Sequence, residues 1–201
     1  MRTGAATSSD SVSQLWLPLL LLIALAWIVR VPIFAEPPGR DQGLFMTEAS
    51  LGAQGRDLYS EVWEHKPPGV IGIYAAAVSV FGNGYRAVQI AHTLAGLLTA
   101  LLLWRLGRKA GLDGVTATAA GVFYLIFYGG PLFGGFWATA QVEIFVDPLV
   151  ALALFCIVPK RDQSVVSRLH WCAAGMLIGI AVAWLKYSCF PLLAIGFLAF
   201  L

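Results

Sequence analysis

Residues 35–68 read AEPPGRDQGLFMTEASLGAQGRDLYSEVWEHKPP and form a charged segment between two long apolar stretches. The segment holds six of the eleven acidic residues of the chain, namely Glu36, Asp41, Glu48, Asp57, Glu61 and Glu64. It also holds four basic side chains: Arg40, Arg56, His65 and Lys66. Ionisable groups are costly to bury in lipid, so those that gather beside a membrane usually bind a ligand or take part in a reaction. We therefore expect the functional residues of the chain to begin in this segment.

The composition of the whole chain is that of an integral membrane protein. Of its 201 residues, 59% are hydrophobic and 12% are charged, and the mean hydropathy is +0.78. Soluble domains carry roughly 25% charged residues. The net charge of +2 gives no support to nucleic-acid binding. The cysteines, Cys156, Cys172 and Cys189, are odd in number and follow no metal-binding spacing, so we interpret them as small core residues.

Six apolar runs are candidate membrane spans, since a helix needs about 20 apolar residues to cross the hydrocarbon core. They are residues 15–34, 87–106, 115–128, 144–158, 171–185 and 189–201. The first run has the alternative reading of a cleaved signal peptide. The leader before it, however, has only one arginine and one aspartate, whereas a signal peptide starts with a positively charged region. The apolar run is also longer than the roughly 7–15 residues of a signal peptide's hydrophobic region, so we expect a retained anchor.

Residues 69–81 are apolar but too short to cross a membrane, because they span roughly 20 Å as a helix. If this segment lies at the interface, the basic patches at Arg2, at 105–109 and at 160–168 all fall on one side. The positive-inside rule assigns that side to the cytoplasm. Residues 35–86 then form the first extracytoplasmic loop, and Lys186 also faces outward.

The outward loop is expected to carry two interfacial helices. Asp41 would cap the first helix, which would run to Gln54 and end at Gly55. The second would begin at Pro68, because proline is tolerated in a first turn, and would end before Gly82. The predicted fold is thus a single all-α integral membrane domain over residues 1–201, with about six transmembrane helices and two interfacial helices.

Four motifs follow one another in the chain: GRDQGLFMTEA (39–49), LYSEVWEHKPPG (58–69), QVEIFVDPL (141–149) and GIAVAWLKYS (179–188). From about residue 15 onward, the chain resembles the N-terminal part of the GT-C glycosyltransferases. Those enzymes take a sugar from a polyprenyl-phosphate carrier on the outer face of a membrane. The resemblance extends to protein O-mannosyltransferases, to the aminoarabinose transferases that modify lipid A, and to RgtA/B/C/D-like lipopolysaccharide transferases.

The resemblance implies that Asp41 is the catalytic base. It would accept the proton of an acceptor hydroxyl while the sugar is transferred with inversion. The residue type alone also fits a helix N-cap. Many family members have Asp-Glu where this chain has Asp41-Gln42, so a function that needs a pair of carboxylates or a metal at this position is not supported.

Two lysines match family positions that meet the carrier phosphate. Lys66 precedes the proline pair, and Lys186 stands at the outward end of the fifth apolar run. Both also fit interfacial lysines that extend to the headgroups. Asp147, with Glu143 one helical turn before it, is expected to orient the sugar or to assist the acceptor. Glu143 also fits a solvated helix end.

Two further substrate-binding candidates are His65 and Glu64. His65 stands where some family members have a glutamate, and Glu64 lies one residue earlier, so a metal site carried over from those members is not secured. The neighbouring aromatic side chains are interpreted as an interface belt, and they are Tyr59, Trp63, Trp137 and Tyr187. Trp137 could in addition stack on a sugar ring.

The sequence contains no GxGxxG fingerprint, no P-loop and no zinc-ligand spacing, and it leaves divalent-metal dependence open. The expected partners are a polyprenyl-phosphate-linked sugar, a hydroxyl-bearing acceptor and membrane lipid. The expected location is the bacterial plasma membrane, with a cytoplasmic N-terminus. Full-length family members are much longer, so we expect these 201 residues to be part of a longer enzyme and to be weak or inactive alone.

A non-catalytic membrane subunit or scaffold and a small-molecule transporter are the alternatives to a transferase. A transporter would need polar residues within several spans, and the middles of these spans lack charges. Convergence of the outward acids with Lys66 on one pocket would favour the transferase.

Overall fold

The computed structural model describes residues 8–62, 64–82, 84–128, 140–163 and 165–200. Within these ranges all regular elements are helices. They are α1 (Ser8–Ile28), the 3₁₀ helix η1 (Val31–Ala35), α2 (Arg40–Ala53), α3 (Gly69–Phe81), α4 (Tyr85–Lys109), α5 (Gly114–Phe123), the π-helix η2 (Tyr124–Tyr128), α6 (Val142–Ile157), α7 (Arg168–Ile180), the π-helix η4 (Ala181–Leu185), the 3₁₀ helix η5 (Tyr187–Cys189) and α8 (Phe190–Phe200). Trp63 and Trp137 lie outside the described residues.

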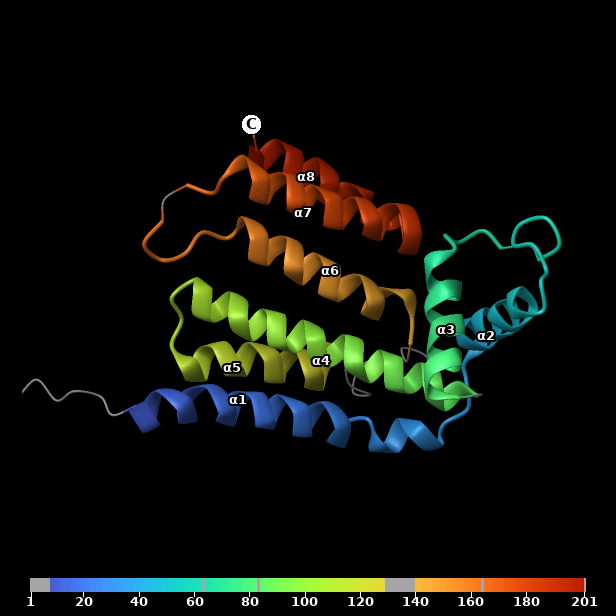
Figure 1. Cartoon of the computed structure of the whole chain (residues 1–201), viewed down its shortest axis with the longest axis horizontal. Coiled ribbons are helices and arrows are strands. Elements are labelled where there is room, and N and C mark those ends of the chain that lie inside the picture. Colours follow the sequence, from blue (N-terminus) through green and yellow to red (C-terminus); the bar gives the residue numbers. More distant parts are fainter. Residues whose placement is uncertain (1–7, 63, 83, 129–139, 164, 201) are drawn as a thin grey trace, which may run out of the picture.

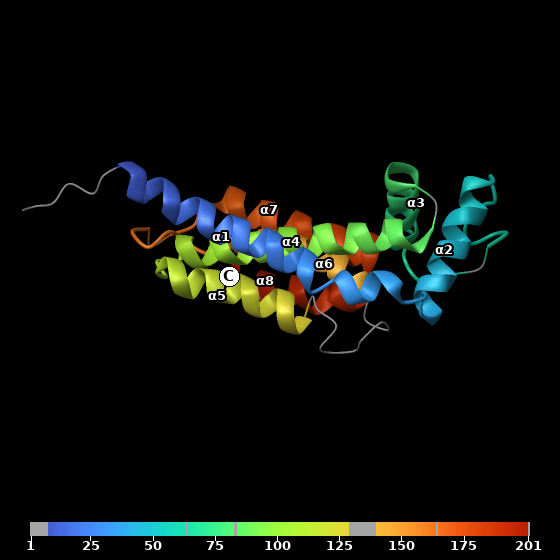
Figure 2. The same cartoon turned by 90° about the horizontal axis from the view of Figure 1, so that it is seen from below.

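The long helices form a bundle with α4 at its centre. α4 packs against α1, α5 and α6, while α7 packs between α6 and α8. α2 and α3 lie beyond one end of this bundle, and α3 runs across that end rather than along it (Figures 1 and 2). The charged segment and the apolar bundle therefore occupy separate parts of the molecule.

Three helical segments in the described part of the chain are long and apolar enough to cross a membrane. They are Trp16–Ala35, Tyr85–Lys109 and Arg168–Leu185. Large apolar side chains on the outside of the bundle suit a lipid environment, for example Leu17, Leu20, Met176 and Ile195. The prediction of an all-α membrane protein is thus supported. α6, with 16 residues, and α8, with 11, are shorter than a full crossing.

The glycines that end α2 and α3 were predicted correctly, but the two helix starts were not: α3 begins at Gly69, with Pro68 as its N-cap, instead of at Pro68. α2 begins after Gly39, which is its N-cap, and Asp41 lies inside the first turn instead of capping it. Gly39 has an extended conformation, which starts the helix earlier than expected. Gly55 follows the C-terminus of α2 with φ +84°, and Gly82 ends α3 with φ +94°, both as predicted.

Close packing of small residues joins α5 to its neighbours. A Cβ atom at Gly121 would lie 2.9 Å from the carbonyl oxygen of Ala100 and 3.0 Å from a methyl of Leu22. Small residues at such contacts let membrane helices approach closely. α1, α4 and α5 therefore pack as one unit.

A separate core lies at the α2 and α3 end of the bundle. It joins side chains from α2, α3, α4, α6 and η4, including Phe45, Tyr74, Val88, Phe145 and Leu185. These elements are distant in sequence, and their charged neighbours are the predicted site residues. The core therefore fixes the segments that carry the site.

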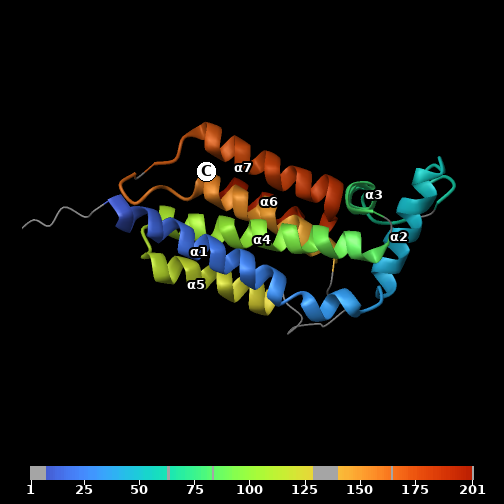
Figure 3. The same ribbon diagram turned by 60° about the horizontal axis from the view of Figure 1, so that its bottom comes forward.

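The two ends of the bundle differ in charge. The connections at 110–113 and 158–167, beside the basic patches, lie at the end opposite α2 and α3, and the separation persists after rotation (Figures 1 and 3). Arg2, the third predicted patch, lies outside the described residues. This arrangement fits the predicted topology, and the side of the membrane that each end faces stays a prediction.

Candidate active site

The backbone of Lys66 is held from both sides in a turn that we call the KPP turn (residues 64–68). One carboxylate oxygen of Glu64 accepts hydrogen bonds from the backbone amides of His65 at 2.6 Å and Lys66 at 2.9 Å. The hydroxyl of Tyr59 donates to the carbonyl of Lys66 at 2.8 Å. The next two residues are prolines, which have no N–H to satisfy and restrict the backbone. The position of Lys66 is therefore set by local hydrogen bonds.

The ammonium of Lys66 contacts the first turn of α2. It lies 3.3 Å from Oδ2 of Asp41 and 4.4 Å from the centre of the Phe45 ring. Phe45 is fully buried and packs edge-to-face against Tyr74, with ring centres 5.5 Å apart. Asp41 lies in the first turn of α2, where the positive N-terminus of the helix attracts negative side chains. α2 thus presents a carboxylate and an aromatic face to Lys66.

A second ion pair is formed by Lys186 and Glu143. Glu143 lies in the first turn of α6, and its carboxylate accepts a hydrogen bond from the ammonium of Lys186. Lys186 follows the π-helix η4 in an extended conformation, with φ −154° and ψ 112°. Sequence reasoning found no basic neighbour for Glu143, since the partner lies 43 residues away.

The start of α6 is anchored by buried side chains of α3 and α4. The amide of Ala140 donates to Nδ1 of His92 at 2.5 Å, and its carbonyl accepts from the hydroxyl of Tyr74 at 2.8 Å. Ala140 has a φ of +56°, a region that L-residues seldom adopt. These contacts fix the path of the chain two residues before Val142 and so aim Glu143 at the pocket.

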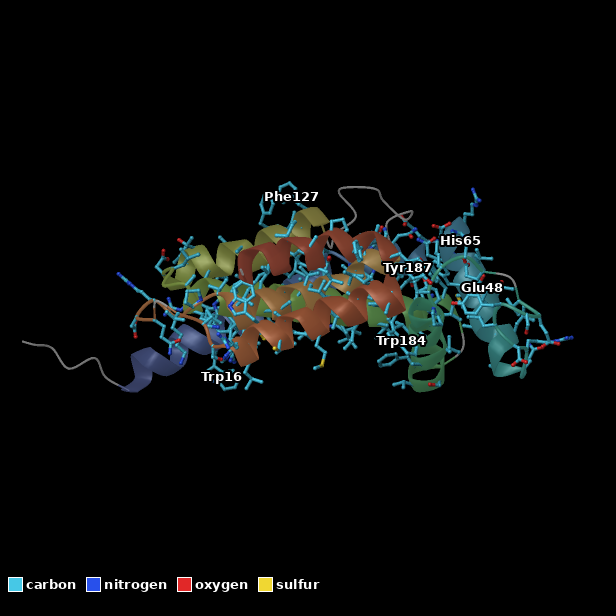
Figure 4. The ribbon with its side chains drawn as sticks, turned by 90° about the horizontal axis from the view of Figure 1, so that it is seen from above. Trp16, Glu48, His65, Phe127, Trp184 and Tyr187 are labelled. Atoms are coloured by element: carbon cyan, nitrogen blue, oxygen red, sulfur yellow. The ribbon has the colours of Figure 1, made fainter. Side chains whose placement is uncertain are left out.

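The two ion pairs meet in one pocket of about 380 Å³ at the α2 and α3 end of the bundle. This volume falls in the usual range for small-molecule sites. The lining residues come from four segments of the chain: Asp41; His65, Lys66 and Pro67; Gln141, Val142 and Glu143; Leu185, Lys186, Tyr187 and Ser188. Figure 4 places His65 and Tyr187 at this end and Trp16 at the opposite end. Asp41 and Glu143, but not Asp147 or Glu64, thus converge with Lys66, and this partial convergence is the arrangement that favours a transferase.

Two predicted site residues do not line this pocket. The side chain of Glu64 is almost fully buried beneath the KPP turn, where it also lies 2.9 Å from Nδ1 of His65. Asp147 lies one turn below Glu143 and accepts a hydrogen bond from the hydroxyl of Tyr124 at 2.7 Å. Substrate contact by Glu64 or Asp147 therefore stays a prediction.

Gln42, the residue that departs from the Asp-Glu pattern of many relatives, is fully buried and lies outside the pocket lining. Among the residues that the structure describes, no group of three or more His, Cys, Asp or Glu side chains is placed to hold a metal ion. The described part of the chain therefore offers no ready-made metal centre beside Asp41.

Sequence reasoning missed Glu48 as part of the site. It is 1% exposed, and burial, the hydrogen bond with Glu64 and the charge of Glu64 together raise its pKa to about 8, although Lys66 acts in the opposite direction. Burial also acts to raise the pKa of Glu64, but the hydrogen bonds from Glu48 and from the two backbone amides outweigh it and lower that pKa. The available signal was spacing: Asp41, Phe45 and Glu48 recur on one face of α2.

Comparison with known proteins gives one match. Residues 65–201, which are 137 of the 201 residues, match the sequence profile of the family described as dolichyl-phosphate-mannose-protein mannosyltransferase. No curated protein and no solved structure matches the chain. The matched range contains Lys66, Glu143, Asp147 and Lys186, and it begins after Asp41. An apolar helical bundle with this match identifies the chain as a member of the dolichyl-phosphate-mannose-protein mannosyltransferase family, which are membrane glycosyltransferases of the GT-C type.

Proposed function

We propose that this chain binds a polyprenyl-phosphate-linked sugar in the pocket at the α2 and α3 end and transfers the sugar to a hydroxyl group. The observation that carries the proposal is the convergence of Asp41 and Glu143 with Lys66 and Lys186 on one pocket. These four side chains come from separate segments of the chain. Two carboxylates and two ammonium groups in one wet cavity are what such a transfer needs.

The lysines are proposed to hold the carrier phosphate. The donor phosphodiester carries one negative charge, and breaking the bond between the anomeric carbon and the phosphate oxygen leaves a second charge on the departing polyprenyl phosphate. Ammonium groups placed where charge develops lower the barrier. Lys66 and Lys186 are each partly exposed, with 24% and 36% of the side chain accessible. Both ammonium groups can therefore contact a ligand in the pocket without a change in the backbone conformation.

Asp41 is proposed as the general base. In the ligand-free protein its carboxylate is paired with Lys66 at 3.3 Å. A phosphate that takes over the Lys66 contact would release the carboxylate beside the sugar. The acceptor oxygen then attacks the anomeric carbon, its proton passes to Asp41, and the bond to the phosphate breaks on the opposite side of the ring. One such displacement inverts the anomeric centre.

The remaining polar groups are proposed to orient the sugar. Glu143, paired with Lys186, would become free for sugar hydroxyls when Lys186 binds phosphate. His65 lines the pocket and can donate or accept hydrogen bonds. Asp147 would support Glu143 from one turn below. The identity of the sugar and of the acceptor is left to experiment.

The proposed setting is a plasma membrane in which six apolar helical segments, the shorter α6 and α8 among them, are embedded in the bilayer and α2 and α3 lie at the outer surface. The pocket end then faces outward and the basic connections face the cytoplasm. A transporter would need polar groups along the spans, whereas this pocket lies at one end of the bundle. A scaffold would not need the paired acids and lysines.

The test is Asp41→Asn in the protein at its full natural length and in its native membrane, with radiolabelled polyprenyl-phosphate mannose as donor. Transfer should fall by about 10²- to 10⁴-fold, which is the usual contribution of a general base. Binding of polyprenyl monophosphate should persist. Asp57→Asn is the matched control, because Asp57 is an exposed acid of the same loop that does not line the pocket. Full transfer by Asp41→Asn would exclude the base assignment.

A further inference from the structure

A buried pair of carboxyl groups lies directly beneath the KPP turn. Glu48, from α2, is 1% exposed, and Glu64, from the turn, is 5% exposed. Among the described residues, no N–H or hydroxyl group reaches either oxygen of Glu48 or the second oxygen of Glu64. The first oxygen of Glu64 is held by two backbone amides, but two negative charges buried side by side still repel each other, and the pair is stable only if it holds a proton.

The surroundings decide which of the two groups holds the proton. Glu64 already accepts the amides of His65 and Lys66, and hydrogen bonds from donors favour an anion. Glu48 has no such donors among the described residues, and the carboxyl group of Glu64 is close enough to share a proton with it. Glu48 is therefore the neutral partner and donates, while Glu64 is the charged partner and accepts.

We infer that Glu48 is a positioning residue: its proton completes the hydrogen-bonding of Glu64, and Glu64 in turn holds Lys66 within reach of Asp41 and of the donor phosphate. The part that concerns binding of the donor phosphate by Lys66 rests on the proposed function. The part that concerns the position of Lys66 in the KPP turn rests on the hydrogen bonds and burial of the turn alone. It assigns to α2 two separate tasks, because Asp41 contacts the ammonium of Lys66 while Glu48 supports the backbone beneath it.

Few other ionisable groups face this pair. The segment between α2 and α3 contributes Lys66, which favours the charged form of Glu48, and Tyr59 and His65, which lie near Glu64. α3 carries no charged residue. The burial of Glu48 raises its pKa to about 8, so the pair is intact at neutral pH and gains a second negative charge as the pH rises through that value.

Two substitutions separate the role of the proton from the role of side-chain volume. In Glu48→Gln the amide can donate the same hydrogen bond but cannot ionise. We expect the affinity for polyprenyl monophosphate at pH 7 to stay within about twofold. We also expect the wild type to bind more weakly above about pH 8, where Glu48 ionises, and Glu48→Gln to lack this weakening. In Glu48→Ala the buried oxygen of Glu64 loses its donor, and we expect binding to weaken on the order of tenfold at pH 7.

Two readouts do not depend on ligand binding or on transfer. Infrared spectra of the wild type at pH 7 should contain absorption from a protonated carboxyl group that is absent from Glu48→Gln. Acylation of Lys66, followed by peptide mass spectrometry and normalised to the exposed Lys160, should be faster in Glu48→Ala than in the wild type and unchanged in Glu48→Gln.

The outcomes distinguish this inference from the proposed function. If polyprenyl phosphate does not bind but the infrared and acylation results are as expected, the proposed function fails and the positioning of Lys66 stands. If Glu48→Gln behaves like Glu48→Ala, or if its infrared spectrum retains the carboxyl absorption, the inference is wrong whatever the protein transfers.

Discussion

Replacing Gly69 by alanine should separate the two lysines of the pocket. Gly69 is the first residue of α3 and directly follows the KPP turn. A Cβ atom there would lie 2.1 Å from the carbonyl oxygen of Trp184, 2.8 Å from its carbonyl carbon and 2.9 Å from a methyl of Leu185. Non-bonded atoms pack at about 3.5 Å, so relieving the 2.1 Å contact requires α3 and η4 to move apart by more than about 1 Å.

The displacement falls where it affects function most. Lys66 lies three residues before Gly69, and Lys186 lies two residues after Trp184, so the same opening moves both ammonium groups. A misplacement of about 1 Å in a reacting geometry can lower the rate by about 10²-fold. Overpacking of a tight contact also destabilises a protein by about 1–3 kcal/mol. For a chain of this size, each kcal/mol lowers the melting temperature by about 2–4 °C.

Gly72→Ala is the matched control on the same helix. It lies one turn further on, and nothing is within 4 Å of its added Cβ atom. Alanine is preferred to glycine in a helix by roughly 0.5–1 kcal/mol, so this variant should melt slightly higher and keep its activity. The measurements are thermal unfolding in detergent and transfer from polyprenyl-phosphate mannose in membranes. Equal melting temperatures and equal transfer in Gly69→Ala and Gly72→Ala would refute the reasoning.

Three further outcomes are expected. Tyr74→Phe removes the donor to the buried carbonyl of Ala140 and should lower the free energy of unfolding by about 1 kcal/mol in denaturant titrations; an unchanged value would show that another donor replaces the hydroxyl. Lys186→Met should weaken binding of polyprenyl monophosphate about tenfold in equilibrium binding, whereas Lys160→Met, at the far end of the bundle, should not, and equal effects would count against the phosphate role. Because the pKa of Glu48 is raised from 4.5 to about 8 on folding, its contribution to stability is fully present below about pH 4.5 and is lost as the pH rises through about 8; the melting temperature should fall between about pH 5 and pH 8 and level off above that, and a similar fall in Glu48→Gln would disprove the cause.

The helices of this protein follow from local signals, and most were predictable. Glycine can adopt positive φ, which is why Gly55 and Gly82 mark the ends of α2 and α3. The predicted cap of α2 was wrong by two residues, because a cap depends on the path of the preceding chain as well as on residue type. Asp41 fits a capping position by composition, yet Gly39 takes that position in the structure.

The candidate site was predictable only in part. Asp41, Lys66, Glu143 and Lys186 were expected to act, and the structure brings them to one pocket. Their pairing was not predictable, since Lys186 and Glu143 are 43 residues apart and Lys66 and Asp41 are 25 apart. Glu48 was missed because burying a carboxyl group is costly, so the sequence favours an exposed side chain at this position. Its buried partner, Glu64, is identified only by the structure.

The sequence by itself determined the apolar helices, the charged segment at residues 35–68 and the residue types that suit phosphate and proton transfer. Those properties depend on residues within a few positions of each other in the sequence, so composition and residue spacing are enough to predict them. Only the tertiary structure decided which carboxylate pairs with which lysine, that Gly69 must lack a side chain, and that Glu48 is buried beneath the KPP turn. These depend on close packing between distant segments, where a shift of about 1 Å makes or breaks a contact.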